Sequence, residues 1–189
     1  MNVGLFFGSF NPVHIGHLII ANLVYQLSPA DQVWFVVSPQ NPFKKSKNLA
    51  SEFDRIDMVR AAIHDDYHLQ VSDIEFSLPK PSYTAHTLAV LSEKFPQHSF
   101  KVVIGGDNLE SFTRWKNYKL ILEEYGLIVY PRPNSENLAL DHVNIQCIEA
   151  PQMDISATQI RNLLKKGKSP KYLVPEPVLQ ILQSRKLYL

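Results

Sequence analysis

Cysteine is nearly absent from this sequence: Cys147 is the only one among 189 residues. A single cysteine excludes an intramolecular disulfide framework, and without a C-x-x-C pair or a Cys/His array no structural zinc site is expected. The shortage of cysteine also fits a reducing compartment. We expect a cytoplasmic protein, because the N-terminus has neither the basic segment nor the small-residue cleavage site of a signal peptide.

Long apolar runs and an excess of charge of one sign are also missing. No hydrophobic stretch approaches the length that spans a bilayer, so no membrane association is expected. The formal net charge is only +1, which provides no overall field to attract nucleic acid. Any anion site must therefore be built locally. Internal repeats and low-complexity tracts are absent, and the length predicts a single domain over residues 1–189.

What the sequence does contain is a regular alternation of strand and helix signals. Predicted strands lie at residues 2–7, 32–38, 68–76, 99–106, 126–133 and 142–150. Predicted helices lie at residues 15–27, 51–65, 82–95 and 154–168. This order favours an α/β fold of the Rossmann-like, doubly wound type, with a mostly parallel sheet, helices on both faces and a helical C-terminal segment. Ligands of such folds bind beyond the carboxyl ends of the strands.

Two finer predictions concern the second and third of these helices. The second is amphipathic, and its apolar face is expected to consist of Phe53, Ile56, Val59 and Ile63. The third is expected to be capped by the hydroxyl group of Ser82 or Thr84.

The stretch G-S-F-N-P-V-H-I-G-H, residues 8–17, directly follows the first predicted strand. Gly8 allows a sharp turn, and the helix start behind it offers backbone N–H groups and a dipole that favour an anion. His14 and His17 share one helical face, and each can donate a ring N–H to a phosphate oxygen. A pair of core or surface histidines is the plainer alternative. A zinc pair fits less well, because zinc helices place histidines at i,i+4 around a carboxylate. The stretch therefore predicts a phosphate site.

A second anion-binding pattern lies in I-S-A-T-Q-I-R, residues 155–161. Ser156 and Thr158 offer hydroxyl groups at a helix start, and Arg161 lies one turn further on, where its guanidinium can fork onto a phosphate. Taken alone, this segment is more simply explained as a capped amphipathic helix.

Together the two stretches resemble the adenylyl- and cytidylyltransferase superfamily, whose signatures are a [TS]-x-x-H-x-G-H-like motif and an I-S-x-T-x-x-R motif. They occur in the right order near the two ends of the chain. The middle segments P-S-Y-T-A-H-T-L, I-G-G-D-N-L-E-S-F-T-R-W-K-N-Y and P-Q-N-P-F-K-K resemble the bacterial nicotinate-nucleotide adenylyltransferases. The sequence departs from that family at Asn11 and His86, where aspartate is common, and at Phe43, where histidine is usual.

The resemblance implies transfer of AMP from ATP to nicotinate mononucleotide, which gives nicotinate adenine dinucleotide and pyrophosphate in NAD biosynthesis. Since the attacking group is itself an anionic phosphate, catalysis needs positioning and charge stabilisation but no protein base. Mg²⁺ is expected to arrive with ATP, with few protein ligands of its own. Alternatives are a sibling enzyme acting on nicotinamide mononucleotide or phosphopantetheine, and a non-catalytic nucleotide-binding domain. The sequence leaves the oligomeric state undetermined, and a homo-oligomer stays open.

The resemblance also implies which residues form the site. The expected catalytic residues are His14, His17, Lys44 and Arg161. The expected ATP-binding residues are Gly8, Ser9, Phe10, His14, His17, Gly105, Asp107, Arg132, Ser156, Thr158 and Arg161. The expected mononucleotide-binding residues are Asn11, Lys44, Tyr83, Thr84, Trp115 and Tyr118. Asp107 either accepts from a ribose hydroxyl or caps a helix. Trp115 and its neighbour Phe112 are both candidates for core packing, so stacking of Trp115 on the nicotinate ring stays one of two readings.

Overall fold

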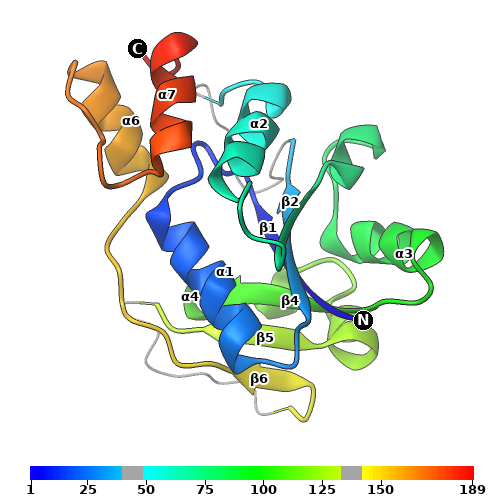
Figure 1. Ribbon diagram of the computed structural model, residues 1–189. Helices are drawn as coiled ribbons and strands as arrows, with labels where there is room; N and C mark the ends of the chain where they lie inside the picture. Colours follow the sequence, from blue (N-terminus) through cyan, green and yellow to red (C-terminus); the bar gives the residue numbers. More distant parts are fainter. Residues whose placement is uncertain (40–48, 133–141) are drawn as a thin grey trace.

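A parallel β-sheet lies at the centre of the computed structural model, which describes residues 1–39, 49–132 and 142–189 (Figure 1). The strands are ordered β3-β2-β1-β4-β5-β6, and every neighbouring pair is parallel. Their bounds are β1 Asn2–Gly8, β2 Gln32–Val37, β3 Leu69–Ser72, β4 Ser99–Gly105, β5 Leu127–Tyr130 and β6 Ile145–Cys147. This strand order is that of the doubly wound Rossmann fold, so the predicted fold class is confirmed.

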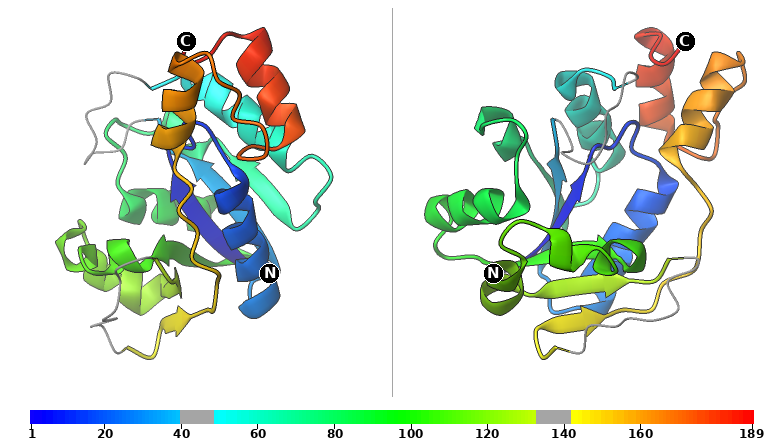
Figure 2. Two further views of the ribbon diagram at one scale, coloured as in Figure 1. Left: turned by 90° about the vertical axis from the view of Figure 1, so that its left-hand side faces the viewer. Right: turned by 180° about the vertical axis from the view of Figure 1, so that it is seen from behind.

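Helices cover both faces of the sheet, as predicted (Figures 1 and 2). One face packs against α1, α2, α6 and α7, and the other packs against α3 and the short helical turns that follow β4. The α-helices are α1 Ile15–Leu27, α2 Glu52–Ala62, α3 Thr84–Lys94, α4 Gly106–Leu109, α5 Tyr118–Leu120, α6 Ala157–Lys165 and α7 Glu176–Ser184. The remaining helical turns are 3-10 helices at Ile74–Ser77 and Phe112–Arg114 and a π-helix at Ile121–Tyr125.

The two cores follow from the alternation of side chains along the strands. In β5, Leu127 and Val129 are buried in the core under α3, whereas Ile128 and Tyr130 are buried in the core under α1. A strand whose side chains are buried on both faces reads as a continuous apolar run, which is why these segments lack strict polar alternation.

The strand predicted at 68–76 is too long. Only Leu69–Ser72 pair in the sheet, and Ile74–Ser77 form a 3-10 helix instead. The reason is Glu75, whose buried carboxylate accepts hydrogen bonds from Ser82 Oγ at 2.7 Å and Thr87 Oγ1 at 2.8 Å. The predicted cap of α3 is wrong for the same reason. Its N-cap residue is Tyr83, and the Ser82 hydroxyl serves Glu75 instead of the helix backbone.

The apolar face predicted for α2 is correct at three of its four positions. Ile56, Val59 and Ile63 are buried, but the side chain of Phe53 is 68% exposed. A charged residue, Arg55, lies fully buried on the inner side of this helix. Hydropathy alone would assign these two residues the opposite way.

The topology places the site at the point where the chain changes direction across the sheet. From β1 the chain proceeds outward to β2 and β3, and it then returns to β4 on the other side of β1. The turns that follow β1 and β4 therefore flank one crevice at the carboxyl ends of the two central strands, where ligands of doubly wound folds bind. None of the helices in the three described ranges combines the length and apolar character needed to cross a bilayer.

Candidate active site

The turn after β1 is tightly packed around Phe10. This residue has a left-handed backbone (φ 43°), and its ring packs edge-on against Phe6 and Phe35 at centroid distances of 5.8 and 5.2 Å. A Cβ at Gly8 would lie 2.7 Å from the Phe10 ring, so a glycine is required there. The side chain of Phe10 belongs to the core, and any contact of this residue with a nucleotide falls to its backbone.

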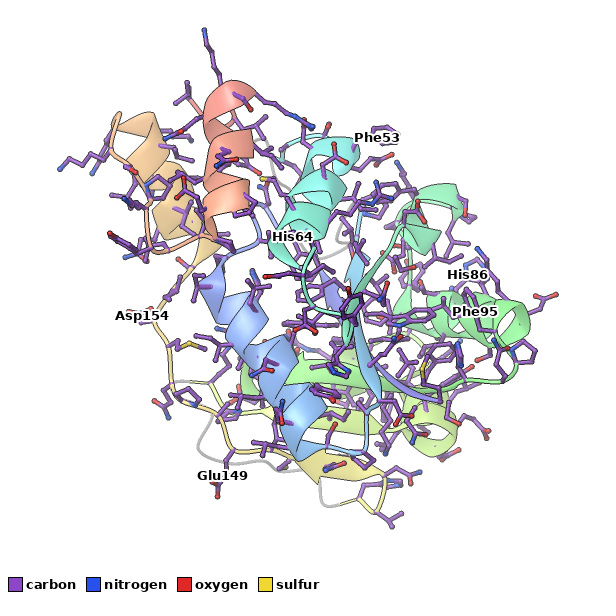
Figure 3. The ribbon with its side chains drawn as sticks, viewed as in Figure 1. Phe53, His64, His86, Phe95, Glu149 and Asp154 are labelled. Atoms are coloured by element: carbon purple, nitrogen blue, oxygen red, sulfur yellow. The ribbon has the colours of Figure 1, made fainter. Side chains whose placement is uncertain are left out.

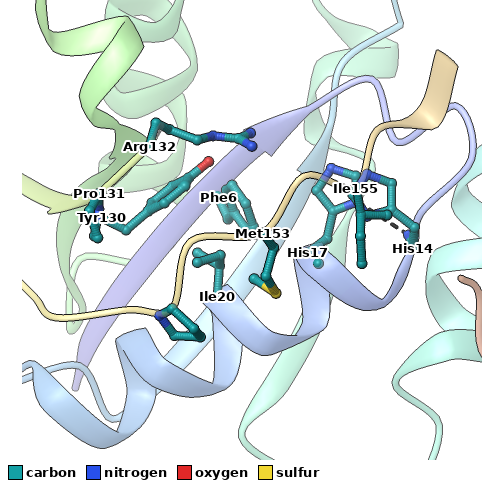
Figure 4. A pocket seen from close by; sticks show the side chains of 11 residues that line it. Phe6, His14, His17, Ile20, Tyr130, Pro131, Arg132, Met153 and Ile155 are labelled. Carbon is teal, nitrogen blue, oxygen red and sulfur yellow. Dashed lines mark hydrogen bonds between the residues drawn. The ribbon is translucent and has the colours of Figure 1, made fainter. Parts of the chain in front are cut away.

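The two histidines form one stacked unit at the start of α1 (Figure 4). Their ring centroids are 3.7 Å apart, and the backbone N–H of His14 donates to His17 Nδ1 at 3.2 Å. Because Nδ1 accepts this bond, the proton of a neutral His17 lies on Nε2, which makes Nε2 a donor suited to a phosphate oxygen. A Cβ at Gly16 would lie 3.1 Å from His14 Nδ1, so the absence of a side chain at Gly16 leaves room for the His14 ring.

His14 is buried and electrically neutral at physiological pH. Its side chain is only 6% exposed, and burial together with the positive charge of Arg132 lowers its pKa to about 4. Its Nδ1 atom is buried without a hydrogen-bond partner among the described residues. In the tautomer that carries its proton on Nδ1, this atom can donate a hydrogen bond to an oxygen of a bound group.

The lowered pKa of His14 predicts a loss of stability in acid. Below pH 6.5 the unfolded chain takes up a proton on this residue that the folded chain refuses until about pH 4. The stability that this group contributes is therefore fully present above pH 6.5 and is lost as the pH falls through that window, by about 3 kcal/mol in all. Thermal melting of the ligand-free protein from pH 7.5 to 4.5 should show a steeper fall for the wild type than for His14→Gln. Parallel curves would contradict the assignment.

The two motif segments meet although 150 residues separate them. Arg161 Nη1 donates to the carbonyl oxygen of Asn11 at 2.8 Å, and its Nη2 donates to Thr158 Oγ1 at 3.0 Å. Ser156 caps α6, because its Oγ accepts the backbone N–H of Gln159 at 3.2 Å. The hydroxyl groups and the guanidinium at the start of α6 thus stand beside the turn that follows β1.

Arg132 extends from the end of β5 into the pocket formed by the histidines (Figure 4). Its guanidinium lies over the Tyr130 ring at 5.4 Å, and its Nε is 3.9 Å from Oδ1 of the largely exposed Asp107. The alternative of Asp107 as a helix cap is wrong, since Gly105 is the N-cap residue of α4. The pocket is lined by Phe6, His14, Gly16, His17, Ile20, Tyr130, Pro131, Arg132, Pro151, Met153 and Ile155.

The residues expected to hold the mononucleotide gather mainly on the other face of the sheet. Lys116 Nζ lies 4.6 Å from the centroid of the exposed Tyr83 ring, at the start of α3 and next to Thr84. Phe112 is fully buried, whereas Trp115 is half-buried against it at a centroid distance of 5.5 Å, so Phe112 is the core member of that pair. Tyr118 packs edge-on against Phe112 at 5.9 Å.

Of the residues at which the sequence departs from the family pattern, His86 lies on α3 and is exposed (Figure 3). Phe43 and the predicted catalytic residue Lys44 lie outside the described residues.

Arg55 is a site-forming residue that sequence reasoning missed. Its side chain is 0% exposed, and burial lowers its pKa. Its guanidinium donates to four carbonyl oxygens, those of Ser9 at 2.7 Å, Ser38 at 2.7 Å, Pro39 at 3.1 Å and Ala50 at 3.1 Å. No carboxylate in the described part of the chain lies within ion-pair distance of it.

Arg55 thereby fixes the turn after β1, the end of β2 and the approach to α2 relative to one another, and its positive charge lies beside the Ser9 carbonyl of that turn. The signal for its burial was its spacing. Arg55 precedes the buried residues Met58 and Val59 by three and four positions, so it shares their helical face.

Known proteins place the chain in a class of nucleotidyltransferases. The family model described as cytidylyltransferase-like matches residues 5–163, and the chain belongs to this family. A protein of Cytophaga hutchinsonii named "Probable nicotinate-nucleotide adenylyltransferase" is 57% identical over 189 residues, which cover 100% of this chain and 98% of that protein. A protein of Flavobacterium johnsoniae with the same name is 44% identical over 191 residues, covering 100% and 99%. Within the larger family, the chain is thus a member of the nicotinate-nucleotide adenylyltransferases, and the resemblance found in the sequence is confirmed.

A solved structure agrees in fold. The nicotinic acid mononucleotide adenylyltransferase of Plasmodium falciparum, complexed with NaAD, superimposes with a TM-score of 0.84 at 19% identity, covering 99% of this chain and 97% of that one. The same enzyme complexed with APC gives a TM-score of 0.82 at 18% identity, covering 99% and 96%. At these identities the likeness establishes the fold.

Proposed function

We propose that this protein transfers the adenylyl group of ATP to nicotinate mononucleotide, giving nicotinate adenine dinucleotide and pyrophosphate in NAD biosynthesis. The observation that carries the proposal is the 2.8 Å contact of Arg161 with Asn11, which joins the two nucleotidyl-transfer motifs at one turn. Two relatives support the choice of acceptor. They are 57% and 44% identical to this chain over its whole length, and the name of each specifies nicotinate nucleotide.

The reaction requires charge stabilisation at phosphorus and little else. A phosphate oxygen of the mononucleotide attacks the α-phosphorus of ATP, and the bond from that phosphorus to the bridging oxygen of the β-phosphate breaks. We assign His14 and His17 to the oxygens of the α-phosphate. Ser156, Thr158 and Arg161 are assigned to the departing pyrophosphate, whose negative charge grows as the bond breaks. Lys44 is proposed to neutralise phosphate charge from the segment after β2.

Magnesium is proposed to enter the site as part of the substrate, MgATP. No group of three or more His, Cys, Asp or Glu that could hold a metal occurs among residues 1–39, 49–132 and 142–189. The ion is proposed to keep ATP oxygens and water as its ligands, as Mg²⁺ usually does. The protein's own contribution is then to hold the phosphates to which the ion is bound.

The adenosine end of ATP is assigned to the pocket between α1 and β5. Asp107 is proposed to accept from a ribose hydroxyl because it follows β4, which borders the crevice, and Arg132 to flank the adenine because it lines the pocket. Gly105 permits close approach at the end of β4. The backbone of Gly8, Ser9 and Phe10 is proposed to face the phosphates.

The nicotinate end is assigned to Tyr83, Thr84, Trp115 and Tyr118, and the phosphate of the mononucleotide to Asn11. Trp115 offers a flat surface on which the ring can stack, and backbone N–H groups at 84 and 118 are the proposed donors to its carboxylate. Nicotinamide would leave such donors unpaired at about 1–3 kcal/mol each, so the acid is the expected substrate.

Replacing Trp115 with alanine tests this division of the site. Stacking of one ring on an aromatic side chain is worth about 1–3 kcal/mol, so KM for the mononucleotide should rise roughly 5- to 150-fold. KM for ATP should stay within about twofold, because the tryptophan lies outside the pocket of His14 and Arg132. Initial-rate kinetics with each substrate varied in turn measures both. A rise confined to ATP would mean that the two halves of the site are assigned the wrong way round.

The function itself is tested by pyrophosphate release with ATP, Mg²⁺ and one acceptor at a time. Nicotinate mononucleotide should give the highest kcat/KM among three acceptors, the others being nicotinamide mononucleotide and phosphopantetheine. A higher value with either of those would move the protein to a sibling activity. Absence of turnover with all three, together with ATP binding by calorimetry, would make it a nucleotide-binding domain.

A further inference from the structure

The segment that follows α7, residues 185–189, is anchored on α2. Arg185 Nη1 donates to Asp54 Oδ1 at 2.7 Å, and its Nη2 donates to Asp57 Oδ2 at 2.9 Å. A guanidinium that uses two nitrogens on two carboxylates fixes direction as well as distance. Residue 185 is thereby tied to the helix that carries Arg55, and the next residues start from a defined point.

The chain then turns back toward the interior. Lys186 and Tyr188 have left-handed backbones, with φ of 51° and 66°, which a residue with a side chain rarely adopts without compensation. The N–H of Leu187 donates to the carbonyl of Leu182 at 3.0 Å, and the Tyr188 ring packs against the core under α1. This conformation directs the Tyr188 side chain toward the turn after β1.

The hydroxyl group of Tyr188 forms a hydrogen bond with the side chain of Asn11. It lies 2.5 Å from Asn11 Oδ1, and the backbone N–H of Ala50 donates to the same atom at 3.1 Å. Since a backbone N–H can only donate, the Asn11 atom that it meets is the oxygen, and the tyrosine must donate as well. Burial raises the pKa of Tyr188, so the hydroxyl keeps its proton throughout the range in which the protein works.

Both oxygen atoms of Asn11 accept hydrogen bonds that fix the turn. Its side-chain oxygen accepts hydrogen bonds from the Tyr188 hydroxyl and the Ala50 backbone N–H, and its main-chain oxygen accepts one from the Arg161 guanidinium. Ala50 is in turn held at its carbonyl oxygen by Arg55. Tyr188 therefore ties the segment after α7 directly to Asn11, in addition to the contacts of Arg185 with α2.

From these contacts we infer that Tyr188 is a positioning residue for adenylyl transfer, acting through the side chain of Asn11 on the turn between β1 and α1. The inference rests on the proposed function, because it concerns the same site. Tyr188 touches no substrate in this assignment. Its hydroxyl holds Asn11 at the angle that keeps the turn, and with it the His14–His17 pair, aligned with the α-phosphate.

The test is Tyr188→Phe, which removes one oxygen and keeps the ring. Loss of one hydrogen bond at the turn should lower kcat about three- to tenfold, with KM for ATP within about twofold, since alignment counts in the transition state. Tyr172→Phe is the matched control, because the Tyr172 side chain is 82% exposed, and it should match the wild type. The melting temperature should fall by no more than about 2–4 °C.

A double-substitution cycle separates positioning from general packing. Asn11→Ala should lower kcat more than Tyr188→Phe does, and adding Tyr188→Phe to it should have no further effect, because the hydroxyl then has nothing to hold. Effects on kcat that multiply in the double variant would overturn the inference. So would a Tyr188→Phe variant with wild-type kcat, or one whose only change is a lower melting temperature.

Failure of the inference and failure of the proposed function give different results. A wild-type protein that releases no pyrophosphate with ATP and nicotinate mononucleotide contradicts the function. A wild-type protein that is active and a Tyr188→Phe variant that is equally active contradict only the role of Tyr188.

Discussion

Replacing His17 with alanine is expected to lower turnover by about a hundredfold or more, the usual consequence of removing one preorganised donor to a transition-state oxyanion. His17 Nδ1 is occupied by the His14 backbone, which leaves the proton on Nε2 and points to that atom as the donor. The reduction should appear in kcat, because the lost donor is proposed to contact the transition state more strongly than bound ATP.

The His17→Ala variant should melt within a few degrees of the wild type. His17 is only half-buried, and the hydrogen bond that its Nδ1 accepts joins it to a backbone N–H at the edge of the helix, not to the core. His64→Ala is the control, because His64 lies on the surface beyond α2, and its turnover should be unchanged. Steady-state pyrophosphate release and thermal melting of both variants provide the measurements. Near-normal turnover in His17→Ala would remove this residue from the mechanism.

Replacing Arg55 with methionine is expected to destabilise the fold by about 3 kcal/mol, which corresponds to a fall in melting temperature of roughly 6–12 °C for a chain of this size. Two terms oppose each other. Removing a buried charge is favourable, but the four carbonyl oxygens of Ser9, Ser38, Pro39 and Ala50 lose their donor. The second term is larger, because each unsatisfied buried carbonyl costs about 1 kcal/mol or more.

The matched control for Arg55 lies on the same helix. Arg60 is more than half exposed and pairs with Asp57 at 3.6 Å, so Arg60→Met should shift the melting temperature by no more than about 2 °C. The melting temperature of Arg55→Lys should lie between those of Arg55→Met and Arg60→Met, because an ammonium group with three donors cannot hydrogen-bond to four carbonyl oxygens. Arg55→Met and Arg60→Met variants with equal melting temperatures would show that the turn is held by other means.

The parts of the molecule that the sequence predicted well depend on local patterns. The buried strands reveal themselves as short apolar runs, and the order of strands and helices then restricts the topology to a doubly wound sheet. The stretch around His14 and His17 and the stretch around Arg161 each carried a local anion-binding signal. Their positions after β1 and at the start of α6 explain why both arrive at the carboxyl edge of the sheet.

The residues that escaped prediction are those whose role is defined by distant partners. Arg55 and Glu75 are charged, and a charge in a sequence suggests the surface, yet both are buried because hydrogen bonds from or to other segments satisfy them. The aromatic ring of Phe53 suggested the core and is exposed instead. Tyr188 gives no signal in its own neighbourhood, since its partner Asn11 is 177 residues away.

The contact of Arg161 with Asn11 also has a consequence for how the protein is made. Synthesis proceeds from the N-terminus at about 5–20 residues per second, so the 150 residues between these partners take roughly 8–30 s to translate. During that time the turn after β1 has been synthesised, but the Arg161 guanidinium that contacts it has not. The proposed adenylyl-transfer centre would consequently be assembled late in translation, because a nascent chain stalled before Arg161 lacks the contact with Asn11.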